Sequence, residues 1–251
     1  MTDLFGGAAP YYVRYRTDHG EEAIDHLGRA LDGTVLDLGC GPGTVAIPLA
    51  AHVREVIAVD PDEEMLAEGR SRSPGNVRWL LGDSTRIRAL PPFDHVVMGR
   101  SFHWMDRVRL LEELDDLLPP GGAVALIGPG RNPEPEPWGE VTQRLRERFG
   151  LGELAARGSF QATGLHPHDL LAVSAFPDLD IATFETSLTR DVESVIGLQL
   201  SYSFSSPAKL GDRLPAFMVA LREALLADNP SGLWVERVVT EVLMARRYGS
   251  S

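Results

Sequence analysis

One short segment constrains the fold of this chain more than any other. Residues 35–43 read VLDLGCGPG, an aliphatic run that ends in an acid and then in three alternating glycines. An apolar run followed by glycines and a helical pattern is typical of a buried strand, a tight turn and a helix N-terminus. Glycine lets the backbone turn sharply and lets a ligand approach the main chain closely. The segment therefore predicts a nucleotide-type cofactor site.

A second acid, Asp60, ends the apolar run at 56–59, about twenty residues after the glycine turn, where a carboxylate can accept hydrogen bonds from ribose hydroxyls. Further apolar runs lie at 76–81, 93–98 and 123–127, and helical patterns lie at 21–31, 44–52, 61–71 and 106–118. Strands that alternate with helices predict a parallel sheet with helices on both faces.

Taken in order, residues 34–128 resemble the class I S-adenosylmethionine-dependent methyltransferases. The resemblance implies an α/β fold: a Rossmann-like, doubly wound seven-stranded sheet with an antiparallel last strand and helical cap or lid additions. Alternating patterns at 181–188 and 238–245 are similar to its final strand pair. We expect a single methyltransferase domain over 1–251, divided into an arm and helix (1–33), a core (34–188), a helical insertion or lid (189–232) and a last strand with tail (233–251).

The resemblance also implies S-adenosylmethionine as cofactor and S-adenosylhomocysteine as product. Asp37 is expected near the cofactor's ammonium, although it can also tie down the loop, and Met65 is either an adenine contact or a core residue. Asp83 and Ser84 match the position that holds the adenine amino group. The expected cofactor-binding residues are Asp37, Gly39, Gly41, Gly43, Asp60, Pro61, Met65, Asp83, Ser84, Arg100 and Ser101.

The segment after the fourth strand, residues 99–104, is expected near the transferred methyl group. His103 is the candidate general base, because an imidazole suits proton removal at neutral pH; the alternative is that His103 and Trp104 simply pack the loop. An aromatic and cationic arm at 11–16 is expected to form a lid over the acceptor together with the late insertion. The expected substrate-binding residues are Tyr11, Tyr12, Tyr15, Arg16, Phe102, His103 and Trp104.

The composition of the chain limits the classes of partner that we expect it to bind. A formal net charge of −12 argues against a nucleic-acid substrate, which normally requires a basic face. No apolar run approaches the roughly 20 residues of a membrane span, and residues 1–5 lack a secretory pattern, so we expect a cytoplasmic protein without a membrane partner. The single cysteine, Cys40, is expected to pack under the loop. His166 and His168 lack further ligands nearby, so no metal is expected.

The sequence thus predicts a methyltransferase that acts on an O, N or C atom of a small-molecule acceptor, as a monomer or homodimer. Lys209 is the only lysine among the Lys and Arg residues, a bias typical of GC-rich genes, which suggests a high-GC bacterial source. The expected setting of the reaction is bacterial secondary metabolism. The alternative is a non-methylating protein that binds S-adenosylmethionine, either a cyclase or a partner subunit. A dinucleotide oxidoreductase is disfavoured because Thr44 stands where its third glycine belongs.

Overall fold

The computed structural model describes residues 6–130, 135–151 and 164–249 of the 251-residue chain. Contacts divide it into two compact units. Within the described residues, unit 1 holds 6–17, 135–151 and 185–238, and unit 2 holds 18–130, 164–184 and 239–249. These units follow contacts, whereas the division into arm, core, insertion and tail follows chain order and stays a prediction.

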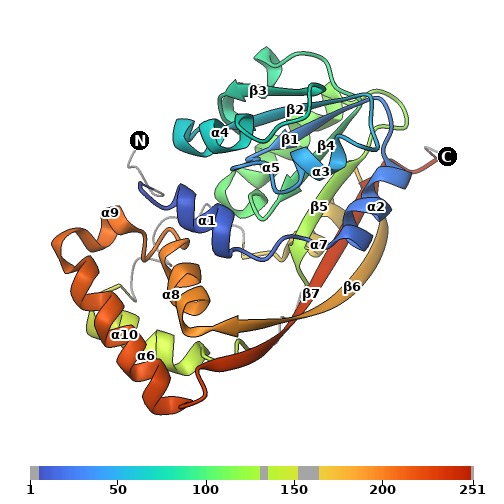
Figure 1. Ribbon diagram of the computed structural model, residues 1–251. Coiled ribbons are helices and arrows are strands. Elements are labelled where there is room, and N and C mark those ends of the chain that lie inside the picture. The colour runs from blue at the N-terminus through green and yellow to red at the C-terminus, as the bar shows by residue number, and fades with distance from the viewer. Residues whose placement is uncertain (1–5, 131–134, 152–163, 250–251) are drawn as a thin grey trace. The chain divides into compact units, whose positions relative to one another are not determined.

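The sheet has seven strands in the order β3-β2-β1-β4-β5-β7-β6 (Figure 1). Its strands are β1 (Thr34–Leu38), β2 (Glu55–Asp60), β3 (Val77–Leu81), β4 (His95–Gly99), β5 (Val124–Pro129), β6 (Asp178–Asp191) and β7 (Leu233–Arg246). Strands β1 to β5 pair in parallel, and β7 runs antiparallel to β5. The predicted fold class is confirmed. The last two strands are longer than the predicted 181–188 and 238–245.

Side chains alternate between two apolar layers along the central strands. In β1, Val35 joins a cluster with Leu27 and Leu49, whereas Leu36 joins a second cluster with Leu114. A strand buried on both faces is typical of a parallel sheet covered by helices on each side. Leu27 and Leu49 belong to α2 (Glu21–Ala30) and α3 (Ala46–Leu49), and Leu114 belongs to α5 (Arg107–Leu117). The sheet of unit 2 is therefore doubly wound.

The strand order reverses at β1, which lies between β2 and β4. Open α/β sheets bind ligands outside the carboxyl ends of the strands at such a switch point. The remaining short elements of unit 2 are α4 (Glu63–Arg70), η1 (Ser84–Ala89), η2 (Phe102–Trp104) and α7 (Pro167–Ala172). Three of them, α4, η1 and η2, follow the carboxyl ends of β2, β3 and β4. The topology thus gathers the segments that were predicted to bind the cofactor.

Unit 1 is helical and has its own apolar core. Its helices are α1 (Ala9–Tyr15), α6 (Gly139–Arg148), α8 (Val192–Leu200), α9 (Pro207–Leu210), η3 (Gly211–Arg213) and α10 (Leu214–Asp228). Phe217, Leu221 and Leu225 lie at helix spacing on one apolar face of α10 and are fully buried. They pack with Trp138 and with residues of α6 and α8. The late insertion therefore folds around a core of its own.

The arm expected at 11–16 forms most of the helix α1. Tyr15 lies against α8 so closely that a Cβ built on Gly197 would be 2.2 Å from its Cδ2 atom. Buried Arg190 holds the end of the helix, because it donates to the Tyr15 carbonyl oxygen at 2.8 Å and to the Thr17 hydroxyl at 2.6 Å. Its Nε also pairs with Glu236 at 2.6 Å. The arm and the insertion are thus joined within unit 1.

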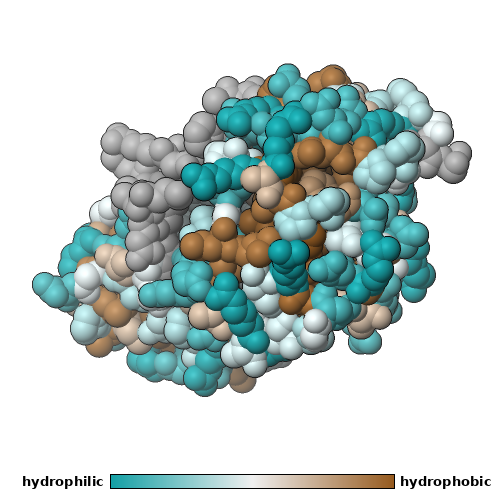
Figure 2. Space-filling view, turned by 90° about the horizontal axis from the view of Figure 1, so that it is seen from above, coloured by the Kyte–Doolittle hydropathy of each residue, from teal (hydrophilic) through white to brown (hydrophobic). Residues whose placement is uncertain are grey.

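None of the helices in the described parts of the chain is long and apolar enough to span a membrane. Figure 2 shows hydrophilic residues over most of the visible surface, with hydrophobic residues gathered near the middle of the view.

Candidate cofactor and acceptor site

The glycine turn after β1 adopts the left-handed backbone that its sequence predicts. Gly39, Gly41 and Gly43 have φ values of +74°, +54° and +84°, which side chains rarely permit. The amides of Gly39 and Cys40 both donate to the carbonyl oxygen of Val59, at 2.8 and 3.0 Å, which fixes the turn to the end of β2. The turn is therefore rigidly anchored to the strand that carries Asp60.

The three glycines differ in what surrounds them. A Cβ built on Gly39 would lie 2.5 Å from Ser101 Cβ, and one on Gly43 would lie 2.6 Å from Trp79 Cη2. A Cβ on Gly41 meets nothing within 4 Å among the described residues. Gly39 and Gly43 thus serve close packing inside the protein, whereas Gly41 leaves open space against the main chain.

Asp37 is a buried acid whose charge is not balanced. The residue is 1 % exposed, and neither carboxylate oxygen has a hydrogen-bond partner within the described part of the chain. Burial raises the pKa of Asp37 to about 7; the nearby Ala46 amide opposes this shift and the charge of Asp60 adds to it. An unpaired buried carboxylate is costly unless a cation or a donor group meets it. Asp37 therefore fits the predicted ammonium partner, the nearby Ala46 amide fits the loop-tying role, and both roles stay predictions.

Asp60 ends β2 and connects two turns. Its Oδ2 accepts from the Gly41 amide at 2.8 Å and its Oδ1 accepts from the Asp62 amide at 2.9 Å. Burial nevertheless raises its pKa to about 6, while these amide bonds act in the opposite direction. Each oxygen keeps a second lone pair, and the residue is 9 % exposed, so it can also meet a hydroxyl from outside.

The residues that follow Asp60 in the sequence differ in their exposure. Pro61 is exposed, and Asp62 caps α4 by accepting from the amides of Glu64 and Met65. Met65 is 3 % exposed, which favours the core alternative over an exposed adenine contact in the free protein. Its predicted role toward adenine stays a prediction.

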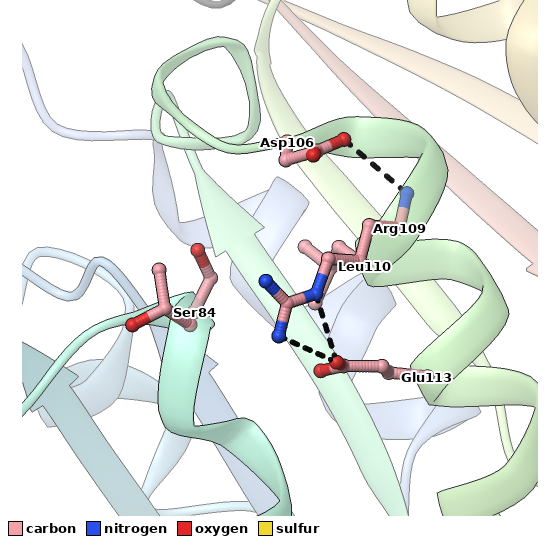
Figure 3. Close-up of a pocket in the computed structure, with 6 residues that line it drawn as sticks. Ser84, Asp106, Arg109, Leu110 and Glu113 are labelled. Atoms are coloured by element: carbon pink, nitrogen blue, oxygen red, sulfur yellow. Dashed lines mark hydrogen bonds and ion pairs between the residues drawn. The ribbon is translucent and has the colours of Figure 1, made fainter.

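Asp83 and Ser84 lie where β3 gives way to η1. Asp83 caps η1, because its Oδ1 accepts from the Thr85 amide at 2.8 Å and from the Thr85 hydroxyl at 2.5 Å. Ser84 faces the start of α5 across a small pocket, opposite Arg109 and Glu113 (Figure 3). That pocket has a volume of about 20 Å³, enough for roughly one water molecule. The predicted role of Asp83 and Ser84 toward the adenine amino group stays a prediction.

The segment after β4 begins with a strained residue. Arg100 has a φ of +55°, the only positive φ of a non-glycine residue in the described ranges. Ser101 is buried, and its hydroxyl donates to the Leu38 carbonyl oxygen at 2.6 Å, which joins the ends of β4 and β1. Backbone strain of this kind gathers at functional sites when the surroundings hold it in place. Here the Arg100 amide, which donates to Ile127 O at 3.1 Å, helps to hold it.

The next three residues form η2. Phe102 is buried, whereas His103 and Trp104 are half-buried, with ring centroids 4.9 Å apart. This contact is compatible with the alternative that both rings pack the loop, and it leaves part of the imidazole exposed at the strand end. The predicted roles as base and substrate contact both stay predictions.

The predicted substrate residues of the arm gather in unit 1. Tyr11 stacks on Tyr15 at 6.4 Å, and the Arg16 guanidinium lies 5.1 Å from the Tyr12 ring and 4.1 Å from the Tyr202 ring. The Nε atom of Arg16 is buried without a hydrogen-bond partner in the described ranges. The arm therefore presents a guanidinium between two aromatic rings, and its role toward an acceptor stays a prediction.

Sequence reasoning missed His19, which precedes α2. It is 2 % exposed, and neither ring nitrogen has a hydrogen-bond partner among the residues that the structure describes. It lines the larger cavity, of about 310 Å³, which is at the low end of small-molecule sites. The other lining residues are Asp18, Gly20, Glu21, Ile24, Asp25, Thr44, Pro48 and His52. A lone histidine in a polar turn gives no sequence signal for burial.

Two other expectations concern cysteine and metal chemistry. Cys40 is 5 % exposed, and burial raises the pKa of its thiol, so it is a packing residue rather than a nucleophile. His168 pairs with Glu241 at 2.6 Å, and the rings of His166 and His168 are 4.8 Å apart. The described residues contain no group of three or more potential metal ligands.

The chain is similar to known methyltransferases. Residues 35–122 match the family model for a methyltransferase domain. The chain is 34% identical to a trans-aconitate 2-methyltransferase from Azoarcus sp., over 87% of this chain and 89% of that protein. It is 35% identical to an uncharacterised methyltransferase from Mycobacterium bovis, over 62% of this chain and 60% of that protein. The chain thus aligns with about three fifths of the mycobacterial relative's length.

Solved structures show the same fold. A protein assigned as a type II methyltransferase from Anaeromyxobacter dehalogenans superimposes with a TM-score of 0.61 at 24% identity, over 93% of this chain and 98% of that one. At this identity the likeness concerns the fold, which agrees with the sheet order and with the antiparallel last strand.

Proposed function

Because the chain belongs to the class I S-adenosylmethionine-dependent methyltransferases, we propose that it transfers a methyl group from S-adenosylmethionine to an O, N or C atom of a small-molecule acceptor. The bacterial relative that acts on trans-aconitate supports a small acid as acceptor. The acidic charge of −12 supports a free small molecule rather than a nucleic acid. We place the reaction in the bacterial cytoplasm, in secondary metabolism.

The observation that carries this proposal is the open main chain at Gly41 between two buried acids. The cofactor fits the residues present: open space lies against Gly41, and Asp37 offers two unpartnered oxygens for an ammonium. Asp60 offers its remaining lone pairs to ribose hydroxyls. Hydrogen bonds to an ionised carboxylate each contribute about 1.5–3 kcal/mol. The site therefore recognises both ends of an adenosyl amino acid.

The bound cofactor supplies an electrophilic methyl group on sulfur. The protein's main task is then to align the acceptor and to exclude water. The segment after β4 lies at the switch point of the sheet, so we assign Phe102 and Trp104 to the acceptor side. His103 removes a proton where the acceptor is an alcohol or an amine. A carboxylate acceptor is already deprotonated at neutral pH and needs no base.

Mass spectrometry of the reaction products tests the proposal. Purified protein is incubated with S-adenosylmethionine and with trans-aconitate or a panel of small acids, alcohols and amines. We expect one acceptor to gain the mass of a methylene group while S-adenosylhomocysteine accumulates in equal amount. Asp60→Ala, which removes the ribose contact, is expected to lower the rate at subsaturating cofactor.

The alternative is a cofactor-binding protein without methyl transfer, either a cyclase or a partner subunit. It predicts S-adenosylhomocysteine binding by calorimetry but no methylated product with any acceptor in the panel. Binding of NADH without binding of either adenosyl ligand would refute both readings.

A further inference from the structure

His19 is a buried side chain that the proposed function does not use. Its Nε2 atom would lie 3.4 Å from a Cβ built on Gly99, the last residue of β4. The same Cβ would meet Val45 of the glycine-turn segment at 2.7 Å and Ile127 of β5 at 3.7 Å. The imidazole thus lies over the carboxyl end of β4, beside the turn that was assigned to the cofactor.

A second buried histidine, at the start of β4, shows how the ring nitrogens of a structural histidine are satisfied. His95 begins β4; its Nδ1 accepts from the Ala123 amide at 3.1 Å and its Nε2 lies 3.1 Å from Asp32 Oδ1. Both of its nitrogens are therefore satisfied. His19 is buried to a similar degree and has neither bond within the described residues. Because buried polar atoms are normally hydrogen-bonded, the two free nitrogens of His19 point to a ligand.

The charged neighbour of His19 is Arg100. Burial lowers the pKa of His19 well below 6.5, and the positive charge of Arg100 lowers it further. The imidazole is therefore neutral at physiological pH and presents one N–H donor and one acceptor. The Arg100 side chain lies over the next strand, since a Cβ built on Gly128 would be 3.3 Å from Arg100 Cγ. A neutral donor and a cation thus flank the carboxyl ends of β4 and β5.

The 310 Å³ cavity beside His19 is lined by negatively charged side chains, opposite in sign to Arg100. Asp18, Glu21 and Asp25 line it, and Asp25 also pairs with His52 at 3.3 Å. Acidic groups at the lining repel a ligand that is only anionic but accept one that also carries an ammonium. The amino acid end of the cofactor carries both charges: its ammonium is the group assigned to Asp37, and its carboxylate matches His19 with Arg100.

We propose that His19 donates a hydrogen bond to a carboxylate that is bound beside Arg100, at the carboxyl ends of β4 and β5. The acidic lining favours the α-carboxylate of the cofactor's amino acid end, and a carboxylate of the methyl acceptor is the second source. The inference rests on the proposed use of S-adenosylmethionine. It adds a specificity residue for that ligand outside the glycine turn.

The test compares two ligands that differ only in this carboxylate. Calorimetry measures the Kd of S-adenosylhomocysteine and of its decarboxylated analogue, S-adenosyl-3-thiopropylamine, on the full chain. In His19→Leu we expect S-adenosylhomocysteine to bind about 10- to 100-fold more weakly, as expected for a lost hydrogen bond to a charged group. The analogue is expected to bind the variant and the wild type within about twofold.

Two further variants separate binding from folding. His19→Gln keeps a donor and an acceptor, and we expect it to recover most of the affinity for S-adenosylhomocysteine. His95→Gln, in the matched buried histidine, should lower the melting temperature without changing either Kd. Trans-aconitate titrated into protein loaded with S-adenosylhomocysteine tests the second source of the carboxylate.

The outcomes are distinct. Loss of trans-aconitate binding in His19→Leu, with an unchanged Kd for S-adenosylhomocysteine, assigns the carboxylate to the acceptor and supports the subsite. Equal weakening of both adenosyl ligands, or no change for any of the three ligands, overturns the inference. A wild-type protein that binds no S-adenosylhomocysteine contradicts the proposed function itself.

Discussion

Replacing Gly41 by tryptophan should separate cofactor binding from stability. Because a Cβ at Gly41 meets no described atom within 4 Å, the cost in the free protein is that of the left-handed backbone at φ +54°. For a residue with a side chain this cost is about 1–2 kcal/mol. In a chain of 251 residues each kcal/mol lowers the melting temperature by about 2–4 °C. We therefore expect a loss of about 2–8 °C.

The effect on the cofactor should be larger. An indole at Gly41 occupies the open space in which the ligand approaches the main chain, so binding requires the loop or the ligand to move. Overpacking of this kind costs about 1–3 kcal/mol, which corresponds to about 5- to 150-fold in Kd. Isothermal calorimetry with S-adenosylhomocysteine measures the Kd, and a thermal melt of the same sample measures stability.

Two matched variants complete this experiment. Gly41→Ala has the same backbone strain and little bulk, so it should melt like the tryptophan variant and bind more tightly. Gly43→Ala adds a contact of 2.6 Å with Trp79 to a φ of +84°, so it should lose more stability than Gly41→Ala. If Gly41→Trp binds S-adenosylhomocysteine with the wild-type Kd, the cofactor does not lie against Gly41 and the reasoning is wrong.

Three further predictions follow from the same site. The carboxyl of Asp37, with a pKa of about 7 in the folded protein and about 3.9 unfolded, binds its proton more tightly when folded, so its contribution to stability is lost as pH rises from about 4 to 7. In urea unfolding, Asp37→Asn should therefore gain stability relative to wild type by about 2.5 kcal/mol between pH 5 and pH 8, the part of the loss that falls above pH 5; an equal difference at both pH values would contradict this. His103→Ala should lower kcat by about 10²- to 10⁴-fold with an unchanged Kd for S-adenosylhomocysteine if the imidazole is the base. Unchanged turnover would instead assign His103 to packing on Trp104. Hydrogen exchange should show residues 11–16 and 191–228 gaining protection together when S-adenosylhomocysteine and acceptor are added, because α1 and α8 pack against each other. Full protection of both segments in the free protein would exclude a closing lid.

Local sequence patterns were sufficient for the sheet and for the glycine turn. The alternation of apolar runs and helical patterns predicted strands 1 to 5 in order, because a strand buried on both faces has few compatible side chains. The positive φ values at Gly39, Gly41 and Gly43 were predictable because only glycine adopts them without strain. Asp37 and Asp60 follow from the same pattern, since the carboxyl ends of parallel strands meet at one edge.

Element ends were less predictable. The helix expected at 44–52 is the short Ala46–Leu49, and the strand expected at 181–188 extends over Asp178–Asp191. The arm at 11–16 forms a helix whose aromatic rings gain their partners from α8, far along the chain. Such ends depend on hydrogen bonds and packing with distant segments, which a local pattern does not contain.

The sequence alone therefore determined the fold class, the glycine turn and the two acids, one in β1 and one at the end of β2. Only the tertiary structure decided which polar groups would be left without partners. Asp37 and His19 are both polar and both buried. The burial of Asp37 could be expected from its place in an apolar strand pattern, whereas His19 lies in a turn between Asp18 and Gly20, where no pattern indicates burial. Segments distant in the chain lie around His19: a Cβ built on Gly99, eighty residues away, would be 3.4 Å from its Nε2 atom, and desolvation is set by the atoms that surround a side chain in space.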